Sequence, residues 1–528
     1  MLNLAYLLTR AARRAPDAPA ILHGGTTRSQ AWLDGRVGRL AGALLGLGLA
    51  RGDRVGLIVE TEPRGLESLL APLRAGLTIV PMNPRLHRED YAFMLRDCGA
   101  RALIVSRDRV GELTELRAQV PGLEHVIAIE GAAEAKGALD YEALVGAASQ
   151  AADAAVDGGD LAWLFYTSGT TGRPKGAMHT HGSLGCMVDA HLVEVFPMAP
   201  AERLAHLTPL SHAAGLLAFH VVAGGGAHVF PTTRGFQPEE FYRLVERHRV
   251  TKTILVPTMI QRMLDAPWPP AHDISSLRSV MYGGAPIYVD RLKQALARFG
   301  PIFVQVYAQG EAPLACTFLS KLDHAGDPAN EQRLASAGRE CHGAEMRILD
   351  ADDRPLAPGV TGEVAVRGGV VMRGYWNNPA ATRETLRNGW LHTGDVGHMD
   401  ADGFLYITAR MKDLIIKGGS NIYPREIEEI LYRHPAVREA TVFGVPDPEW
   451  GEEVVAAVAL HPGQAATGAD LAQWCRASMS NFKAPARFHV LPDLAKSGYG
   501  KILKREVRQA LYPDAGQWTG GNRAAAGP

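Results

Sequence analysis

The stretch YTSGTTGRPKG, residues 166–176, contains three glycines, four serine or threonine hydroxyls and one lysine. Glycine lets the backbone adopt conformations that bring several N–H groups close to a ligand. The hydroxyls add further donors and Lys175 adds a positive point charge, so the stretch predicts a loop that binds a polyphosphate. The candidate phosphate-binding residues are Thr167, Ser168, Gly169, Thr170, Thr171, Gly172 and Lys175.

A kinase-type P-loop and a plain polar loop are two alternative interpretations of these residues. In the P-loop of kinases and GTPases a Ser or Thr follows the lysine, whereas Gly176 follows Lys175 here. A plain polar loop between a strand and a helix would also contain glycines and hydroxyls. The order of the residues favours a phosphate-binding loop of another kind.

On both sides of this loop, short apolar runs alternate with segments of helical periodicity. Strands separated by helices indicate a largely parallel sheet that is covered on both faces. Leu33, Val37, Leu40, Ala41, Leu44 and Leu45 recur at helical spacing and predict one buried helix face. The predicted strands include residues 55–59, 78–81, 102–105, 253–256, 279–282 and 302–307.

The pattern changes beyond residue 340, where short strands such as 363–367 and 404–408 alternate with turns. A new small unit begins near Met411. In this unit Pro424 starts a predicted helix, and residues 439–443 and 454–460 are predicted strands. The Gly- and Ala-rich end of the chain is predicted to be disordered.

Composition limits the partners of this 528-residue chain, which is long enough for two to four packed units. The net charge of −1 gives no electrostatic case for binding nucleic acid. Five separated cysteines without a CxxC pair favour neither a disulfide framework nor a zinc cluster, and they fit a reduced, cytoplasmic location. The segment between Arg203 and Arg234 lacks charged residues, but Pro209 and the glycines 224–226 interrupt it. We therefore expect a buried helix flanked by core strands there and no transmembrane segment.

The loop at 166–176 resembles the phosphate-loop signature of the adenylate-forming superfamily, which includes acyl-CoA synthetases, peptide-synthetase adenylation domains and luciferases. Further segments match the family's pattern in the family's order, so the resemblance covers roughly residues 5 to 510. They are YAQGE (307–311), GWLHTGD (389–395), ARMKD (409–413) continuing to KGGSNIYP (417–424), and SGYGKI (497–502).

The resemblance implies roles for the nucleotide-binding residues. Glu311 is expected to hold Mg²⁺, a cation that prefers carboxylate oxygen, and Tyr307 is expected to lie against adenine. Asp395 would accept hydrogen bonds from both ribose hydroxyls, which suits an acceptor-only carboxylate. Arg410 would contact ribose and phosphate, and Lys501 would be the lysine that assists adenylation.

The resemblance also implies residues for the acyl group and for coenzyme A. Lys412 falls at the hinge about which the C-terminal domain would rotate between half-reactions. Gly418 and Gly419 match a backbone stretch that approaches the pantetheine arm of CoA. His212 falls at a gating position, with an ordinary structural histidine as the alternative. The expected acyl pocket comprises Gly283, Gly284, Ala285 and Ala308.

Three positions depart from the family's pattern. Ala308 stands where glycine is usual, Gly310 where threonine is usual, and Tyr499 where threonine is commoner. The missing hydroxyl at Gly310 removes a phosphate contact that the family makes. An inactive nucleotide-binding module is therefore one alternative, against which Lys175, Glu311 and the other matched residues argue.

The sequence thus predicts an α/β protein with a large N-terminal domain of mixed α/β layers, part of it a distorted β-barrel, and a small mobile C-terminal α+β domain. The expected limits are residues 1–411, 412–514 and a tail at 515–528. The expected function is an acyl-CoA synthetase that uses ATP, Mg²⁺ and CoA, with a medium- or long-chain fatty acid favoured. An aryl acid, a different acceptor and a luciferase-like oxygenase are the alternatives. The absence of an aspartate near His212 disfavours a peptide-synthetase adenylation domain, and a homodimer is compatible with the sequence.

Overall fold

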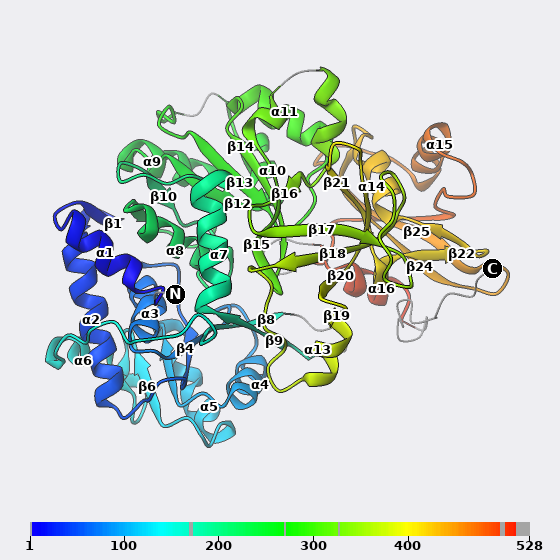
Figure 1. The fold of residues 1–528 in the computed structure, drawn as a ribbon. Coiled ribbons are helices and arrows are strands. Elements are labelled where there is room, and N and C mark those ends of the chain that lie inside the picture. Colours follow the sequence, from blue (N-terminus) through cyan, green and yellow to red (C-terminus); the bar gives the residue numbers. More distant parts are fainter. Residues whose placement is uncertain (1–2, 168–172, 269–270, 326–327, 497–501, 514–528) are drawn as a thin grey trace.

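The computed structural model describes residues 3–167, 173–268, 271–325, 328–496 and 502–513. Two large, mostly parallel sheets form the first part of the chain, an antiparallel sheet follows, and a small α+β unit ends it (Figure 1). The helices are α1 (Tyr6–Arg14), α2 (Gln30–Gly46), α3 (Pro63–Arg74), α4 (Arg88–Cys98), α5 (Leu113–Gln119), α6 (Tyr141–Ala147), α7 (His181–Ala190), α8 (Ala213–Gly224), α9 (Pro238–His248), α10 (Pro257–Asp265), α11 (Val289–Phe299), α12 (Lys321–His324), α13 (Pro379–Thr385), α14 (Pro424–Tyr432), α15 (Gly468–Ser478) and α16 (Lys504–Leu511).

The seven-stranded sheet has the order β7-β6-β5-β3-β4-β8-β9, and every neighbouring pair except β8–β9 is parallel. The apolar runs predicted as strands form its centre, and β4 and β5 are buried along their whole length because both faces are covered. Its strands are β3 (Arg54–Ile58), β4 (Thr78–Pro81), β5 (Ala102–Val105), β6 (His125–Ala128), β7 (Leu139–Asp140), β8 (Leu161–Thr167) and β9 (Lys175–Thr180).

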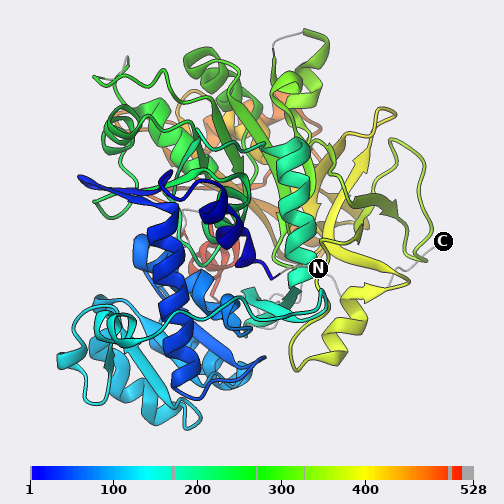
Figure 2. The same ribbon diagram turned by 60° about the vertical axis from the view of Figure 1, so that its left-hand side comes forward.

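The nine-stranded sheet has the order β16-β15-β14-β13-β12-β10-β11-β1-β2, with a parallel block from β14 to β1. Helices α1 and α2 run between the two large sheets (Figure 2), and α2 contacts both α3 and β1. The strands are β1 (Pro19–His23), β2 (Thr26–Ser29), β10 (Arg203–Ala205), β11 (Ala227–Phe230), β12 (Lys252–Leu255), β13 (Ser279–Gly283), β14 (Phe303–Gln309), β15 (Ala312–Leu319) and β16 (Arg339–Glu340).

Helices α8 and α2 contain the segments for which the sequence predicts a buried helix and a buried helix face. The charge-free segment forms β10, the almost wholly buried α8 and β11, as expected for a core helix flanked by strands. No helix in the described parts of the chain is long and apolar enough to cross a membrane. In α2 the expected apolar face holds except at Leu45, which is 42% exposed. Leu44 and Leu45 are adjacent and therefore point about 100° apart on a helix, so only Leu44 reaches the core.

A five-stranded antiparallel sheet forms the part expected as a distorted β-barrel. Its order is β17-β18-β20-β19, with β21 paired to β20. Its strands are β17 (Ala344–Leu349), β18 (Gly362–Gly368), β19 (Leu386–Arg387), β20 (Trp390–Met399) and β21 (Leu405–Arg410).

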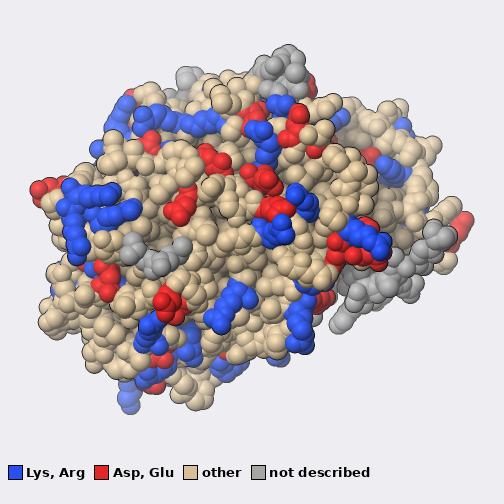
Figure 3. Space-filling view, viewed as in Figure 1, with Lys and Arg blue, Asp and Glu red and all other residues tan. Residues whose placement is uncertain are grey.

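The C-terminal unit packs α14 and α15 against an antiparallel sheet to which β26 adds in parallel. This unit lies beside the five-stranded sheet (Figure 1). Over the face of the molecule shown in Figure 3, acidic and basic side chains are interspersed. Its strands are β22 (Ile415–Lys417), β23 (Ser420–Ile422), β24 (Val437–Asp447), β25 (Gly451–Leu460) and β26 (Arg487–Leu491). All five cysteines are free thiols.

Candidate active site

Strand β14 and the turn after it carry three polar side chains at alternate positions, Tyr307, Gln309 and Glu311. Alternate residues of a strand share a face, so the first two can reach one partner. The Tyr307 hydroxyl and Gln309 Nε2 each donate to Asp395 Oδ2 over 2.7 Å. The sequence analysis missed Gln309. The signal for it was its position two residues after Tyr307 and two before Glu311, both of which were candidates.

Asp395 on β20 is 3% exposed and faces Arg410 across the ladder between β20 and β21. Arg410 Nε lies 3.0 Å from Asp395 Oδ1, and this carboxylate is the main cause that raises the pKa of Arg410. Burial, with Asp395 beside it, also raises the pKa of Tyr307 well above its usual range. The paired charge stabilises a carboxylate that would otherwise be costly to bury.

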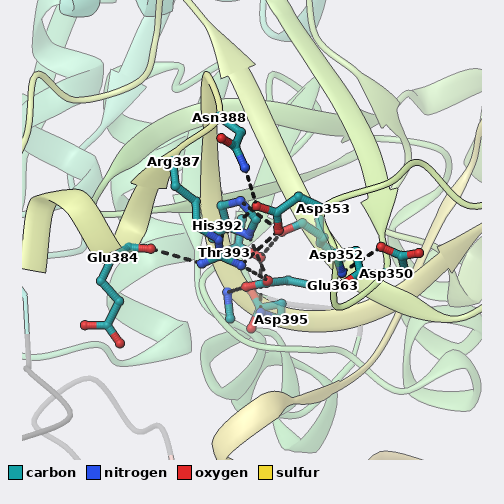
Figure 4. Close-up of polar contacts among 12 residues, drawn as sticks. Asp350, Asp352, Asp353, Glu363, Glu384, Arg387, Asn388, His392, Thr393 and Asp395 are labelled. Carbon is teal, nitrogen blue, oxygen red and sulfur yellow. Dashed lines mark hydrogen bonds and ion pairs between the residues drawn. The ribbon is translucent and has the colours of Figure 1, made fainter. Parts of the chain in front are cut away.

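A second layer of polar contacts holds the turn that precedes Asp395 (Figure 4). Glu363 on β18 accepts a hydrogen bond from the backbone N–H of Gly394 at Oε1 (3.1 Å) and contacts His392 Nδ1 at Oε2 (2.8 Å). Arg387 bridges Glu363 and Asp353. The sequence analysis missed Glu363, for which the only signal was a carboxylate directly before the apolar residues 364–366 of a strand.

Glu311 is the centre of a second cluster, built from segments far apart in the chain. The hydroxyls of Thr167 and Tyr375 both donate to its Oε1, over 3.1 and 2.7 Å. Lys175 Nζ lies 5.2 Å from the centre of the Tyr375 ring, within range of a cation–π contact. The structure therefore brings Thr167 to Glu311 and Lys175 to Tyr375, the other donor to Glu311. The predicted residues Ser168, Gly169, Thr170, Thr171 and Gly172 lie outside the described residues.

The departure at Gly310 has a packing cause. A Cβ at this position would lie 2.2 Å from Thr167 Cγ2 and 3.1 Å from Phe165 Cδ1. The Gly310 carbonyl also lies 2.7 Å from His179 Nε2, and burial lowers the pKa of His179 to about 4. A neutral ring donates to a carbonyl only through a protonated Nε2. The turn is thus pressed against β8, and no side chain fits at Gly310.

Magnesium is tested by the chemistry of these donors. Mg²⁺ is held through one or two carboxylates together with substrate phosphates and water, and it seldom has an all-protein cage. The described residues contain no group of three or more His, Cys, Asp or Glu that could hold a metal. A single carboxylate at Glu311, next to a phosphate-binding loop, fits Mg²⁺ that arrives with a nucleotide.

The predicted acyl residues lie near the start of α8 and at the carboxyl ends of β13 and β14. His212 precedes α8, its ring is 5.4 Å from that of Phe165, and burial lowers its pKa to about 4, so it is neutral near pH 7. A Cβ on Gly283 would lie 2.5 Å from the Val306 carbonyl oxygen, whereas nothing lies within 4 Å of one on Gly284. Ala285 and Ala308 are half-buried.

The remaining candidates are in or next to the C-terminal unit. Lys412 follows β21 in a short 3₁₀ turn, and burial, followed by the charge of Arg410, lowers its pKa. Gly418 and Gly419 form the turn between β22 and β23 with φ of 53° and 79°. This turn contacts Trp450 of its own unit, and Lys501 lies outside the described residues.

Residues 8–376 match the family of AMP-binding enzymes, and residues 426–501 match the C-terminal domain of the same enzymes. The chain is an AMP-binding enzyme. The expected adenylate-forming family is thereby confirmed, and the two matched regions belong to its large and small parts.

Relatives of this AMP-binding enzyme include a medium/long-chain-fatty-acid–CoA ligase, FadD8 of Mycobacterium tuberculosis. The two are 36% identical over 98% of this chain and 91% of the relative. A feruloyl-CoA synthase of Amycolatopsis is 38% identical over 95% of this chain and 97% of its own length. The expected class, an AMP-forming acid–CoA ligase that uses ATP and CoA, is confirmed.

Solved structures similar to the AMP-binding enzyme include the amide bond synthetase McbA of Marinactinospora thermotolerans. Its TM-score is 0.87 at 30% identity, over 96% of this chain and 99% of that one. ATP-bound MatB of Rhodopseudomonas palustris also has a TM-score of 0.87, at 29% identity over 97% and 99%. The predicted fold, with a large and a small part, is confirmed.

Proposed function

We propose that this acid–CoA ligase activates an apolar carboxylic acid, with a medium- or long-chain fatty acid favoured and an aryl acid as the alternative. The observation that carries the proposal is that β14 contributes both to the candidate nucleotide site and to the candidate acyl residues. Its polar face leads to Asp395 and Glu311, while Ala308 comes two residues after Val306, the register partner of Gly283 at the end of β13. One strand can thereby align a nucleotide with an acid.

In the first half-reaction a carboxylate oxygen of the acid attacks the α-phosphorus of ATP. The bond from that phosphorus to the bridging oxygen breaks, pyrophosphate leaves, and an acyl-adenylate forms. Charge builds on the phosphoryl oxygens, so positioning and electrostatics supply most of the catalysis. We assign the ribose to Asp395 and Arg410, and the phosphates to the loop at 167–175 and to Lys501.

Glu311 would hold Mg²⁺, which supplies positive charge to the phosphates when bound. Thr167 and Tyr375 both donate to Glu311 Oε1, so they orient the carboxylate and leave it acceptor capacity for a cation. Neutral His212, beside Phe165, would border the acid. Because the ring carries no charge, it would not form an ion pair with the carboxylate of the acid.

In the second half-reaction the thiol sulfur of CoA attacks the acyl carbonyl, the bond to AMP breaks, and a thioester forms. We propose a domain boundary between residues 411 and 412 and assign the hinge to Lys412. The turn at Gly418 and Gly419 would then approach the pantetheine arm, as glycine without a Cβ permits. A homodimer and a cytoplasmic location stay predictions.

The acid is proposed from the lining and from two relatives of similar identity. None of the described residues expected around the acid is charged: His212 is neutral and contacts Phe165, and Gly284, Ala285 and Ala308 are small, which favours an apolar acid. Gly283 supports the proposal less, because close approach of β14 already requires glycine there. The relatives act on a fatty acid and, by name, on a feruloyl group.

A substrate panel tests the proposal. AMP and pyrophosphate are measured with fatty acids of graded chain length, benzoates and cinnamates, each with and without CoA. We expect AMP release that requires acid and CoA together and is fastest with a fatty acid. If the enzyme turned over cinnamates and no fatty acid, the proposed fatty-acid substrate would be wrong. If pyrophosphate formed without a thioester, CoA would not be the acceptor.

A further inference from the structure

The carboxylate of Asp395, to which we assign the ribose, is hydrogen-bonded to β14 through one of its two oxygens. Oδ2 accepts a hydrogen bond from the Tyr307 hydroxyl and another from Gln309 Nε2, each over 2.7 Å. Oδ1 lies 3.0 Å from Arg410 Nε. A carboxylate oxygen offers about two acceptor positions, so side chains of β14 take both positions of Oδ2. Oδ1 is the oxygen that is left for a ligand.

The orientation of the Gln309 amide is fixed by its two partners. Besides its bond to Asp395, Nε2 donates to the Thr393 carbonyl over 2.9 Å. Both partners are acceptors, so an amide turned the other way would place its oxygen against two oxygens. Gln309 therefore uses both amide hydrogens to tie Asp395 and Thr393 to β14.

The turn that carries Asp395 is also held by β18 (Figure 4). The Thr393 hydroxyl donates to the Val364 carbonyl over 2.6 Å and accepts from the backbone N–H of Asp395 over 3.1 Å. The side chain of Asp395 is 4% exposed, whereas that of Arg410 is 43% exposed. A ligand thus reaches Asp395 most readily at Oδ1, beside Arg410.

Exchanging a β14 donor for a ligand hydroxyl at Oδ2 would bring no net gain. If Gln309 left Asp395, its amide and the Thr393 carbonyl would both lose partners, and a departing Tyr307 hydroxyl would lose its own. A buried polar group left unpaired costs about as much as one new hydrogen bond gains. The two donors are therefore expected to stay on Oδ2 when a nucleotide binds.

We propose that Gln309 is a positioning residue that makes ribose recognition asymmetric. With Tyr307 it keeps Oδ2 occupied, so Asp395 accepts a hydrogen bond from only one ribose hydroxyl, at the position of Oδ1 that Arg410 leaves open. Adenine and phosphate fix the sugar in the site, so the same hydroxyl always faces Oδ1. This differs from the family expectation that Asp395 binds both hydroxyls, and it rests on the proposed assignment of the ribose to Asp395.

The test measures the binding of AMP, 2′-deoxy-AMP and 3′-deoxy-AMP to the full-length protein by calorimetry, which needs neither acid nor CoA. The wild type is compared with Gln309→Met, which keeps the length of the side chain without its donors, and with Tyr307→Phe, which removes the other donor to Oδ2. Gln464→Met is the matched control, because Gln464 is exposed and lies in the C-terminal unit. Melting temperatures confirm that each variant is folded. The two deoxynucleotides are compared within one protein, so a general loss of binding cancels.

In the wild type and the control we expect one deoxynucleotide to bind about tenfold or more weaker than AMP, and the other within about threefold of AMP. A hydrogen bond to a charged group is worth about that first factor. In Gln309→Met and in Tyr307→Phe an acceptor position opens on Oδ2, so the second hydroxyl can bind as well. The two deoxynucleotides should then bind these variants with affinities within about threefold of each other.

Three outcomes would contradict the proposal in different ways. Equal weakening of both deoxynucleotides in the wild type would overturn the asymmetry and leave the ribose at Asp395. Binding of both as tightly as AMP would overturn the assignment of the ribose itself. An asymmetry that persists in Gln309→Met would overturn the role of Gln309. A protein that shows the expected binding pattern and yet activates no fatty acid would overturn the proposed acid alone.

Discussion

Gly310 shows at the scale of one residue why a hydroxyl is missing from a phosphate-binding turn. The space for a Cβ is taken by Thr167 Cγ2 at 2.2 Å, so a threonine at this position would force Thr167 to move. One residue later, the Glu311 carboxylate accepts a hydrogen bond from Thr167. Its orientation therefore depends on the same packing.

Gly310→Thr tests this packing. Forcing extra atoms into a packed contact costs about 1–3 kcal/mol, so we expect a lower melting temperature and slower adenylation. Gly46→Ala is the control, since nothing lies within 4 Å of a Cβ there. Unchanged stability together with faster adenylation would show that the turn does accommodate the hydroxyl.

Glu311→Gln tests the charge at the phosphate end of the site. The amide keeps the shape but removes the negative charge, and losing one such electrostatic contact costs on the order of 10²–10³ in rate. We expect that loss in acid-dependent ATP–pyrophosphate exchange, with a raised Mg²⁺ requirement. The exposed Glu384→Gln is the control, and equal activity of the two variants would remove Glu311 from the mechanism.

At the scale of elements, β18 supports the turn that presents Asp395 from β20. Glu363 accepts from Gly394 N–H and contacts His392, and a glutamine can replace only one of these carboxylate oxygens as an acceptor. A buried donor left without a partner costs about 1–3 kcal/mol. For Glu363→Gln we expect weaker AMP binding by calorimetry with little change in the rate at saturating ATP. A fall in that rate with unchanged AMP affinity would contradict this positioning role.

The elements around α8 bury several histidines, which predicts a pH dependence of stability. Burial lowers the pKa of His191 to about 4 and of His206 and His220 to about 3, from about 6.5. The unfolded chain therefore binds more protons between those values, so the free energy of unfolding falls as pH drops from 6.5 toward 4. Each histidine contributes about 1.4 kcal/mol per pH unit in that window.

Guanidinium unfolding at pH 7.5, 6.0 and 5.0 measures this effect. We expect the midpoint to decrease steadily below pH 6.5, and the decrease to be smaller in His220→Phe, which removes one titrating ring. A midpoint that is constant from pH 7.5 to 5.0 would show that these histidines titrate alike in the folded and unfolded chain.

At the scale of the whole molecule, the C-terminal unit contacts the large part beside the acyl residues. Tyr432 at the end of α14 stacks on Tyr288, just before α11, with ring centres 3.7 Å apart. Arg291 Nη2 lies 3.0 Å from His461 Nε2, and Arg425 donates to the Ile407 carbonyl over 2.9 Å. Tyr288 follows Gly283, Gly284 and Ala285 by three to five residues, so the domain contact lies close in the chain to the candidate acyl residues.

If rotation about Lys412 separates the half-reactions, this stack stabilises one of the two arrangements. We expect Tyr432→Ala to slow adenylation several-fold and to leave thioester formation from preformed acyl-adenylate unchanged or faster. Tyr432→Phe keeps the ring and should behave as the wild type. An equal loss in both half-reactions would indicate a general effect on folding.

Much of the architecture was predictable because it is encoded locally. The apolar runs at 102–105 and 279–282 lie in β5 and β13 as predicted, and Pro424 begins α14. Periodicity indicates which residues of one segment share a face, but it does not give the residue at which the element begins or ends. Thus β14 extends to Gln309 and includes a residue that the sequence analysis left out.

The sequence by itself determined the family, the chemistry of the phosphate loop and the alternation of strands and helices, because each depends on residues close together in the chain. Only the tertiary structure decided that Thr167 and Tyr375 meet at Glu311, that Gln309 and Arg410 share Asp395, and that Gly310 has no room for a side chain. These contacts join residues up to 144 positions apart. They follow from strand order and register between sheets, which no local pattern of residues records.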